Sequence, residues 1–492
     1  MLTFKTENRN MYTLDKDTGL FIPISETFIA VNNELSDNKS KDQIIKKLET
    51  KHDINDITFY YDWINKWKKI KPEKNHLNFY KYATPSDLKR YILKNGLLQM
   101  ILCVTEDCNL RCKYCVYSDN YEYTRSHSEE KMDFKTAKKA IDYYFKLIKE
   151  GLKFNPLRRP GIGFYGGEPL LNFELIKICV EYIKKEYPTY ETQFTITTNG
   201  TLLEESKSDW LMENEFTISI SLDGPEKEHD RLRVYPDGKG SFNDVINNVQ
   251  HITNKKYDKV NVLPVFDWKS DLFQMETFFS QKEIPQVSAL SQVDSETKTK
   301  YYEDFTESDY NDFREKVDSI REYYFQNINT QKIEKESVFD HLVGFAPSKE
   351  LFDTLTLINP DPIMPYTGAC IPGRKIFVDI TGNLHMCERV NDSFPIGNVN
   401  NGLEFDKIIL LIQNYLQSMD KCSDCNVRWK CGFCFKQFMT NDGFLSSSKY
   451  CENIESNMKY SFINTLNIAE RFHDFIEESN TKHKNLKKFL RD

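Results

Sequence analysis

Three cysteines lie within ten residues of this 492-residue chain. The segment EDCNLRCKYC, residues 106–115, places thiols at Cys108, Cys112 and Cys115, with three residues in the first interval and two in the second. A cubane iron-sulfur cluster needs a donor at each iron, so three thiolates from one loop leave one iron open. A structural zinc site normally completes four ligands with a second CxxC or a His pair, and none follows nearby. The spacing therefore favours an iron-sulfur cluster with an open iron over zinc.

The triplet follows the first of several strand patterns that alternate with amphipathic helical patterns between residues 96 and 295. Helical periodicity is clear over 133–150 and 173–187. The alternation predicts an α/β fold, a partial (β/α)6 barrel, in which functional residues follow the strands. The expected strands are 98–104, 161–166, 193–198, 216–221, 260–265 and 285–290.

Residues 1–85 are predicted to form a separate α+β module of winged-helix type. Short strand patterns precede two helical patterns, 40–52 and 55–70, with Ser40 and Asn55 as the expected caps. A polar segment, 71–90, is interpreted as a connection. The expected strands are 2–6, 11–15, 19–24 and 27–31.

The remaining chain divides by composition. We expect a charged helical linker over 296–365, a cysteine-rich domain over 366–455, and a closing helix with a tail over 456–492. Two of the twelve cysteines, Cys103 and Cys179, stand outside both groups, and we expect them to fill core space as small apolar side chains.

Composition narrows the class of protein. The formal charge is -8 and the pI is near 5.8, with acidic and basic residues interspersed, so no basic stripe favours a nucleic-acid partner. No apolar run reaches the length of about 18 residues that a membrane span needs. The polar N-terminus lacks the apolar core of a signal peptide. We therefore expect a cytoplasmic protein without a membrane span, in which grouped cysteines bind metal.

The motifs together resemble the radical SAM superfamily. CxxxCxxC with Tyr114 before its last cysteine follows the first strand, and YGGEP at residues 165–169 follows the second. The resemblance implies a [4Fe-4S] cluster whose open iron binds S-adenosylmethionine (SAM), which is cleaved to a 5'-deoxyadenosyl radical that abstracts hydrogen. It also implies a SAM site. Its expected residues are Tyr114, Gly166, Gly167, Glu168, Asn199 in TTNG, Ser221 in SISLDGP, and Arg231.

The C-terminal cysteines are similar to the SPASM extension of radical SAM enzymes, which holds two auxiliary clusters. The resemblance assigns one cluster to Cys422, Cys425, Cys431 and Cys451, and leaves Cys370, Cys387 and Cys434 for the other. With the SAM cluster this makes three [4Fe-4S] clusters, the last having an open or non-cysteine corner. The interval between the third and fourth cysteines of CSDCNVRWKCGFC is two residues where the family usually has three, so ligand geometry there could differ.

One acidic residue is a candidate catalytic base. Glu388 directly follows Cys387, and a carboxylate beside an auxiliary cluster could deprotonate a substrate thiol or hydroxyl, a role assigned to an acid here in related enzymes. The alternative is a solvated glutamate paired with Arg389.

The resemblance predicts a maturase of ribosomally made peptides. The N-terminal module would bind the precursor's leader by strand addition, or would serve only for dimerisation or packing. A cysteine sulfur would be joined to carbon as a thioether, and an auxiliary cluster would accept the remaining electron. A flavodoxin or ferredoxin-type protein would supply electrons. Alternatives are carbon-carbon cross-linking, epimerisation, sulfatase-type oxidation of Ser or Cys, tRNA modification, or a non-catalytic metal-cluster binding protein.

Overall fold

The computed structural model describes most of the chain. The described residues are 2–16, 19–37, 39–70, 83–293, 299–327, 336–344, 370–418, 422, 425–428, 431, 435–445 and 448–471.

A nine-stranded mixed sheet forms the centre of the molecule, with strand order β14-β13-β12-β11-β4-β5-β6-β7-β8. Strands β11 and β4 to β8 pair in parallel, and β12, β13 and β14 complete it as antiparallel strands. The strands are β4 (Gln99–Thr105), β5 (Gly161–Gly166), β6 (Gln193–Thr198), β7 (Thr217–Ile220), β8 (Val260–Val262), β11 (Lys375–Val378), β12 (Asn383–His385), β13 (Gly397–Asn398) and β14 (Gly402–Leu403). The predicted α/β class is confirmed.

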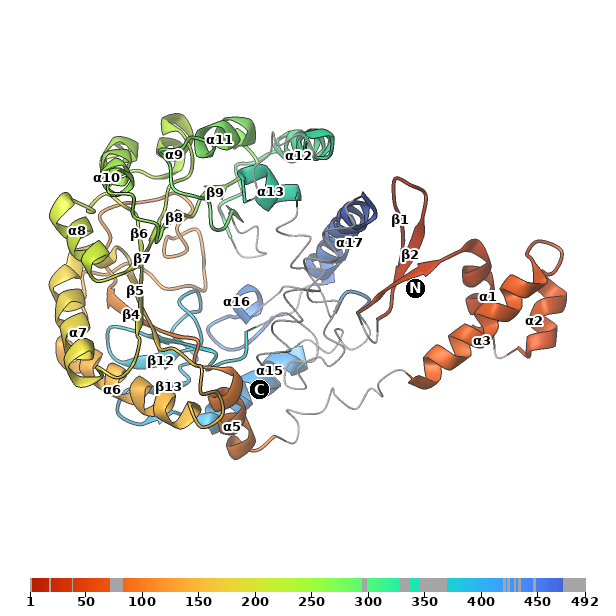
Figure 1. Ribbon diagram of the computed structural model, residues 1–492, viewed down its shortest axis with the longest axis horizontal. Coiled ribbons are helices and arrows are strands. Elements are labelled where there is room, and N and C mark those ends of the chain that lie inside the picture. Colours follow the sequence, from red (N-terminus) through yellow and green to blue (C-terminus); the bar gives the residue numbers. More distant parts are fainter. Residues whose placement is uncertain are drawn as a thin grey trace.

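Helices cover the outer face of this sheet in an arc (Figure 1). Their apolar positions recur every three or four residues, as in α6, where Ala137, Ile141, Tyr144 and Ile148 are buried. The helices of this part are α5 (Pro85–Asn95), α6 (Phe134–Gly151), α7 (Phe173–Glu186), α8 (Glu205–Glu213), α9 (Glu226–Leu232), α10 (Phe242–Asn254) and α11 (Leu272–Phe279), with a short 3-10 turn η2 (Pro169–Asn172).

The expected sixth strand, 285–290, is a single parallel bridge between Val262 and Val287. The regular pairing comes later, where β10 (Ser291–Gln292) runs parallel to β9 (Val265–Phe266).

The expected connection 71–90 is partly wrong. Residues 71–82 lie outside the described residues, and α5 begins at Pro85 because Thr84 and Asp87 form a capping box.

The N-terminal module has three antiparallel strands and three helices. The strands are β1 (Leu2–Lys5), β2 (Met11–Leu14) and β3 (Phe21–Ile24), and the helices are α1 (Glu26–Ser36), α2 (Lys41–Leu48) and α3 (Ile54–Ile70). The expected fourth strand, 27–31, is wrong, because Ser25 caps α1 and Phe28 and Val31 lie on its buried face. Ser40 caps α2 as predicted. Asp53, not Asn55, caps α3 by accepting from the amides of Asn55 and Asp56.

The C-terminal part contains α12 (Glu307–Asn327), α13 (Val338–Val343), α15 (Phe405–Ser418), α16 (Phe435–Phe438) and α17 (Ser448–Arg471). Helix α17 starts earlier than expected and includes Cys451. It lies beside the β1–β2 hairpin (Figure 1), where Phe4 and Leu14 form an apolar cluster with Phe462 and Leu466. The N-terminal strands therefore pack on the last described helix.

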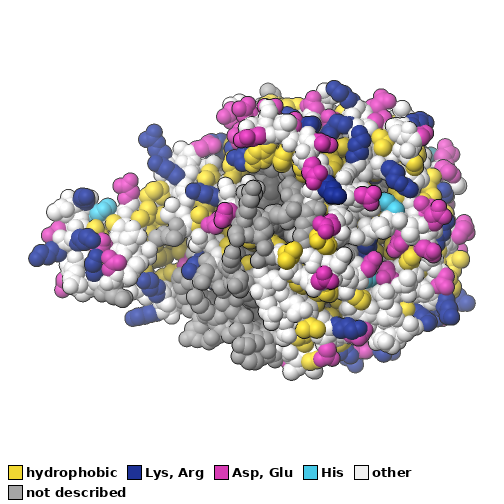
Figure 2. Space-filling model, turned by 180° about the vertical axis from the view of Figure 1, so that it is seen from behind, with side chains coloured by type: hydrophobic (Ala, Val, Ile, Leu, Met, Phe, Trp, Pro, Cys, Tyr) yellow, Lys and Arg dark blue, Asp and Glu magenta, His cyan; other side chains and the backbone are white. Residues whose placement is uncertain are grey.

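In the view of Figure 2, acidic and basic side chains are interspersed over the visible described surface. Among the helices of the described ranges, none combines the length and apolar character that crossing a bilayer requires.

Candidate active site

The cysteine triplet lies in the loop that leaves the carboxyl end of β4. Two amides of this loop are bonded to the end of α9, from Arg111 to the Val234 carbonyl (2.7 Å) and from Lys113 to the Leu232 carbonyl (2.9 Å). All three thiols are half-buried, and desolvation is the main cause that raises the pKa of each. The loop therefore holds its three sulfur atoms in a sheltered position at the edge where β4 ends.

The double glycine of YGGEP lies directly against this loop. The amide of Gly167 donates to the Thr105 carbonyl (3.0 Å), and the amide of Glu168 donates to the Asp107 carbonyl (2.8 Å). A Cβ atom on Gly166 would stand 2.0 Å from the Thr105 oxygen, and one on Gly167 would stand 2.2 Å from the Asp107 oxygen. Only glycine permits this approach, so the motif's first function in the fold is to hold the start of the cysteine loop.

Glu168 is fully buried. Its carboxylate accepts from the Thr198 hydroxyl (2.7 Å), the Asn199 amide (2.7 Å) and the Leu170 amide (3.1 Å). Desolvation raises the pKa of this carboxyl, while the hydrogen bonds act in the opposite direction. Glu168 thereby connects the loops that follow β5 and β6.

Asn199 lies against the triplet, with its Nδ2 2.8 Å from Asn109 Oδ1 and 3.9 Å from Cys108 Sγ. Ser221 follows β7, and its amide donates to the Thr198 carbonyl (2.9 Å). The structure thus brings Asn199 to the cysteine loop and Ser221 to the neighbouring strand end.

Tyr114 contacts two buried charged side chains, Asp223 and Arg233. Its hydroxyl donates to Asp223 Oδ2 (2.7 Å) and accepts from Arg233 Nη1 (2.5 Å). Desolvation raises the pKa of the Asp223 carboxyl. The Nε atom of Arg233 is buried without a hydrogen-bond partner, and its charge favours the Cys112 thiolate. Arg233 was not predicted as a site residue. The only signal for it in the sequence was its position two residues after Arg231.

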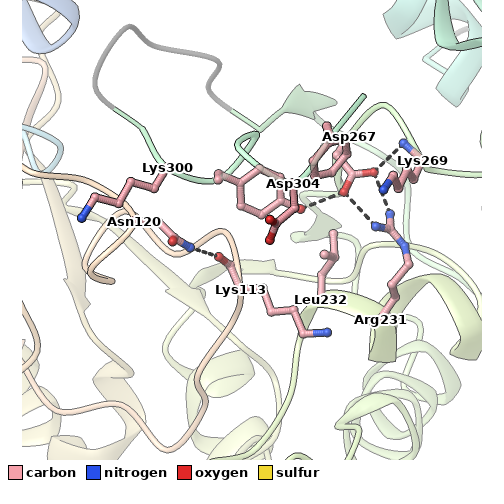
Figure 3. A pocket seen from close by; sticks show the side chains of 10 residues that line it. Lys113, Asn120, Arg231, Leu232, Asp267, Lys269, Lys300 and Asp304 are labelled. Carbon is pink, nitrogen blue, oxygen red and sulfur yellow. Dashed lines mark hydrogen bonds and ion pairs between the residues drawn. The ribbon is translucent and has the colours of Figure 1, made fainter. Parts of the chain in front are cut away.

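Arg231, the predicted SAM contact, is engaged elsewhere. It forms a bidentate ion pair with Asp267, at 2.7 and 2.9 Å (Figure 3). It also contacts Glu228 at 3.2 Å. The pair lines an open cleft of about 500 Å³ together with Lys113, Lys269, Lys300 and Tyr301. Of the two arginines, Arg233 and not Arg231 therefore lies beside Cys112 and Tyr114.

His127 is a further neighbour of the triplet that sequence patterns did not single out. Its Nε2 lies 3.6 Å from Cys115 Sγ, and its Nδ1 lies 3.1 Å from the Glu106 carbonyl. Since a carbonyl only accepts, Nδ1 carries the proton. The ring also packs edge-on against Tyr117.

The second cysteine region reaches the first through the sheet. Because β11 pairs with β4, the segment after β12 that carries Cys387 and Glu388 lies near the loop after β4. The Tyr117 hydroxyl donates to the Glu388 carbonyl (3.1 Å). Burial raises the pKa of Tyr165, and the nearby carboxyl of Glu388 and thiols of Cys115 and Cys387 act in the same direction. Glu388 is half-buried, and its Oε2 atom is buried without a hydrogen-bond partner.

The other C-terminal cysteines are only partly described. The amide of Cys425 donates to the Cys422 carbonyl (3.3 Å). Burial raises the pKa of the Cys425 thiol, and the nearby Glu455 carboxyl and Cys451 thiol act in the same direction. Cys370 is exposed, and Cys434 lies outside the described residues. Cys425 thus lies near Cys451 of α17, although the two are 26 positions apart in the sequence.

The donor set fits an iron-sulfur cluster and a charged ligand. Three sheltered thiols from one loop are soft donors of the kind that iron-sulfur clusters use. Beside them, Arg233 has a buried and unpartnered donor, which suits an anionic group.

Comparisons with known proteins agree with this chemistry. The Radical SAM superfamily model matches residues 102–268. An uncharacterized protein of Methanocaldococcus jannaschii is 40% identical over 152 residues, 31% of this chain and 47% of its own length. A cysteine-type anaerobic sulfatase-maturating enzyme of Clostridium perfringens is 24% identical over 396 residues, 75% of this chain and 97% of its own.

A solved structure of anSMEcpe that holds AdoMet and a peptide has a TM-score of 0.57 at 21% identity, covering 77% of this chain and 100% of that one. Across the first three curated relatives, the chain spans about half of their length, between 44% and 56%.

Proposed function

The chain carries a radical SAM domain at residues 102–268, and on this premise we propose that it is a peptide maturase that joins a cysteine sulfur to a carbon atom of its substrate as a thioether. The observation that carries the proposal is the pairing of β11 with β4. It brings Glu388 and Cys387, from a region more than two hundred residues downstream, to the neighbourhood of the cysteine triplet.

The residues around the triplet are suited to hold the cluster and SAM. Cys108, Cys112 and Cys115 would ligate three irons of a [4Fe-4S] cluster and leave the fourth for SAM. When bound, these groups supply a 5'-deoxyadenosyl radical that removes a hydrogen atom from the substrate, and an auxiliary cluster supplies an acceptor for the remaining electron.

The protein's own groups would set the geometry of this site. The bonds of Gly167 and Glu168 to the loop fix its start. Arg233 and Tyr114 would offer donors to an anionic group beside Cys112, as a buried guanidinium suits a carboxylate. Glu168, Asn199 and Ser221 would shape the rest of the pocket, and the ion pair of Arg231 with Asp267 would support its outer rim.

Glu388 would act as the base. A thioether forms when the carbon gives up one hydrogen atom and the thiol gives up one proton, so a proton acceptor is needed beside the sulfur. The Oε2 atom of Glu388 is buried without a hydrogen-bond partner, which leaves an acceptor free for this proton.

The C-terminal cysteines would hold two auxiliary clusters, one on Cys422, Cys425, Cys431 and Cys451. The other would use Cys370, Cys387 and Cys434. The nearness of Cys425 and Cys451 supports the first set. We further propose that the N-terminal module binds the leader of a precursor peptide and that a flavodoxin or ferredoxin-type protein donates electrons.

A first experiment tests the cluster assignment. Anaerobically prepared protein should contain about twelve irons, as three cubanes require, and should cleave SAM to 5'-deoxyadenosine after reduction. The triple variant Cys108→Ala, Cys112→Ala, Cys115→Ala should keep about eight irons and lose cleavage. Zinc in place of iron, or iron without SAM cleavage, would favour a non-catalytic metal protein.

A second experiment tests the reaction. Candidate precursors encoded beside the gene are incubated with enzyme, SAM and reductant, then alkylated with iodoacetamide and analysed by tandem mass spectrometry. A thioether removes two hydrogens from the peptide and leaves the modified cysteine unalkylated. The Glu388→Gln variant should still cleave SAM and form little cross-link. Carbon-carbon cross-linking would leave every cysteine alkylated and contradict the proposal.

Oxidation of a cysteine to formylglycine is the second candidate, favoured by the match to the Clostridium perfringens sulfatase-maturating enzyme over 97% of that enzyme's length. This reaction also consumes a thiol, but it removes sulfur from the peptide and installs an aldehyde. Trapping with a hydrazide reagent therefore distinguishes the two products.

A further inference from the structure

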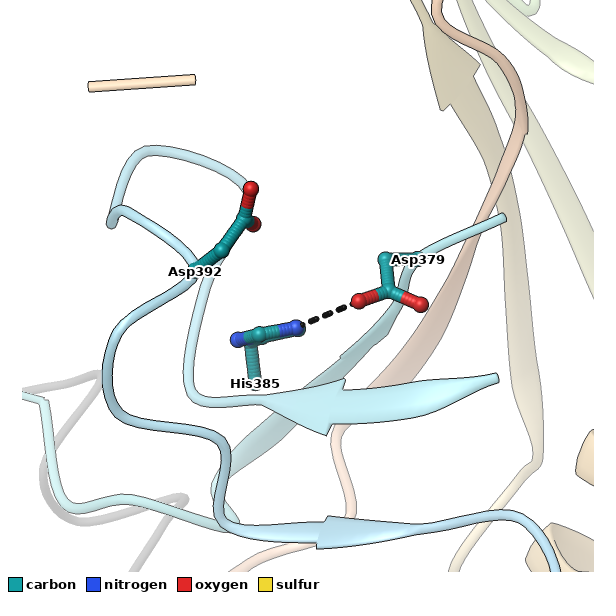
Figure 4. Close-up of side chains that lie close together, drawn as sticks. All are labelled: Asp379, His385 and Asp392. Carbon is teal, nitrogen blue, oxygen red and sulfur yellow. Dashed lines mark hydrogen bonds and ion pairs between the residues drawn. The ribbon is translucent and has the colours of Figure 1, made fainter. Parts of the chain in front are cut away.

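A buried polar cluster lies next to the segment that carries Cys387 and Glu388. Asp379, at the end of β11, accepts from His385 Nε2 at 2.8 Å, and both side chains are almost fully buried (Figure 4). With Asp392 they place three ligand-type atoms within 4.8 Å of one another, a spacing that suits a cation. Asp392 itself is exposed.

The positive charge in this place belongs to Arg125. This residue is only 6% exposed, and its Nη1 forms an ion pair with Asp392. The carboxylate of Asp379 is also occupied, since its Oδ1 accepts from the amides of Thr381 and Asn383. Asp392 is therefore paired with a guanidinium and Asp379 with His385 and backbone amides, and we assign no metal to this cluster.

The contacts of Arg125 point in three directions. Its Nε donates to the Val390 carbonyl (3.0 Å), its Nη1 meets Asp392, and its guanidinium lies over the ring of Phe377 at 4.9 Å. Such an arrangement needs the planar, branched donor set of arginine, and a lysine could make one of these contacts at a time. We define Arg125, Phe377, Val390 and Asp392 as the Arg125 clamp.

The clamp connects two regions that are remote in sequence. Arg125 follows the cysteine triplet by ten residues, while its backbone partner Val390 is 265 residues further on. On the other side, the Asp379–His385 pair holds the ends of β11 and β12 together. Cys387 and Glu388 lie in the short segment between these two fixed points.

From this placement we infer that Arg125 is a positioning residue, which sets where Glu388 and Cys387 lie relative to the cysteine triplet. The inference rests on the proposed function in so far as Glu388 is taken as the base. A displacement of about 1 Å in a reacting group can cost a hundredfold in rate. Loss of the clamp should therefore leave radical formation intact and impair the use of the radical.

The test uses the full holoenzyme with three variants. Arg125→Met removes the charge and keeps much of the volume, Arg125→Lys keeps the charge without the branched donors, and Asp392→Asn removes the ion pair at an exposed position that should not disturb folding. Arg159→Met is the matched control, because it removes an arginine from the exposed ion pair with Glu191.

Two quantities are measured after iron content is shown to match the wild type. The first is product formed per 5'-deoxyadenosine, which should fall about tenfold or more in Arg125→Met, less in Asp392→Asn, and stay unchanged in the control. Arg125→Lys should restore only part of the coupling. The second is hydrogen exchange of the peptide that covers residues 386–392, which should become faster in the same order.

The outcomes separate the inference from the proposed function. Exchange needs no substrate, so unchanged exchange in Arg125→Met and Asp392→Asn would overturn the clamp even if the wild type forms thioethers. Equal losses of SAM cleavage, iron and product in both variants would also overturn it, because they would show a general structural role. Faster exchange in an enzyme that makes no thioether would keep the clamp and reject the proposed reaction.

Discussion

The two cysteine regions of this protein are built in opposite ways. In the first, three thiols lie on one short loop, and the bonds of Gly167, Glu168, Arg111 and Lys113 hold that loop from both sides. In the second, the thiols between Cys370 and Cys451 come from separate segments, including the loop after β12 and helix α17. The first region depends on contacts that a local motif specifies, and the second depends on packing between distant segments.

This difference predicts which substitutions impair metal binding in each region. A substitution in the first region should abolish one site and leave the rest of the molecule intact. In the second region, substitutions far from any cysteine should also reduce iron retention, because α17 packs against the N-terminal strands.

The largest effect is expected for Gly167→Ala. The added Cβ would stand 2.2 Å from the Asp107 carbonyl oxygen, and relieving this overlap costs about 3 kcal/mol and displaces the cysteine loop. SAM cleavage should fall at least about a hundredfold, with loss of about four irons, as measured by product assay and iron analysis.

The matched control is Gly238→Ala, where a Cβ meets no atom within 4 Å and only the positive φ of +85° is unfavourable. It should cost about 1 kcal/mol and keep all iron. Equal losses in both variants would contradict the prediction, because they would show that the loss at Gly167 does not depend on its approach to Asp107.

Cys451→Ala should disrupt metal binding in the second region and leave the first region intact. We expect loss of about four irons from one of the two proposed auxiliary clusters. SAM cleavage should stay within about threefold of the wild type, because the triplet and its supporting bonds are untouched. Iron analysis and electron paramagnetic resonance measure the two effects. Loss of SAM cleavage in proportion to iron would mean that the two regions are not independent.

Glu470→Gln tests whether the N-terminal strands support the second cysteine region. The Glu470 carboxylate accepts from Tyr12 (2.8 Å), Thr6 (3.0 Å), Asn8 (3.0 Å) and Asn10 (3.1 Å). An amide cannot accept at its nitrogen, so docking of the β1–β2 hairpin on α17 should weaken by about 1 to 2 kcal/mol. Hydrogen exchange over residues 2–14 measures it, and auxiliary iron should become easier to remove by chelator while SAM-cluster iron does not.

The same contact gives a pH dependence. Burial would raise the pKa of the Glu470 carboxyl, but the hydrogen bonds from Tyr12, Asn10, Thr6 and Asn8 together lower it. Its stabilisation is therefore complete above the ordinary glutamate pKa of 4.5 and is lost as pH falls through the lowered value. The difference in exchange between wild type and Glu470→Gln should be full at pH 7 and shrink in acid. A difference that does not change with pH would show that packing of the side chain, and not the charge of the carboxylate, causes it.

The smallest effect is expected for Cys179→Ala. This side chain is fully buried in the main core among apolar neighbours, so its truncation should cost about 1 kcal/mol of the free energy of unfolding. Urea titration measures this cost, and all iron should remain. Any loss of iron would show that a cysteine outside both regions takes part in metal binding.

Much of the first region could be predicted because its signals are local. The strand patterns of β4 to β7 were found nearly to the residue, and the triplet and YGGEP lie together because each directly follows a strand. Prediction failed where local patterns are ambiguous. TFIAV has strand-forming residues, but the Ser25 cap and the burial of Phe28 and Val31 on one face make it a helix. Arg231 was predicted and Arg233 was not, since only the turn at the end of α9 decides which of the two lies beside Cys112 and Tyr114.

Local sequence patterns were sufficient to predict the α/β class, the position of the triplet after the first barrel strand, and the glycines that let two loops approach. Each of these depends on residues close together in the chain. Two features depend on the complete fold: β11 adds to the sheet beside β4, with Phe377 opposite Ile101, and Arg125 contacts Val390 and Asp392. Several apolar segments of similar length could pair with the edge of β4, and burial in the complete fold selects one of them, so no local pattern reveals which segment meets the active site.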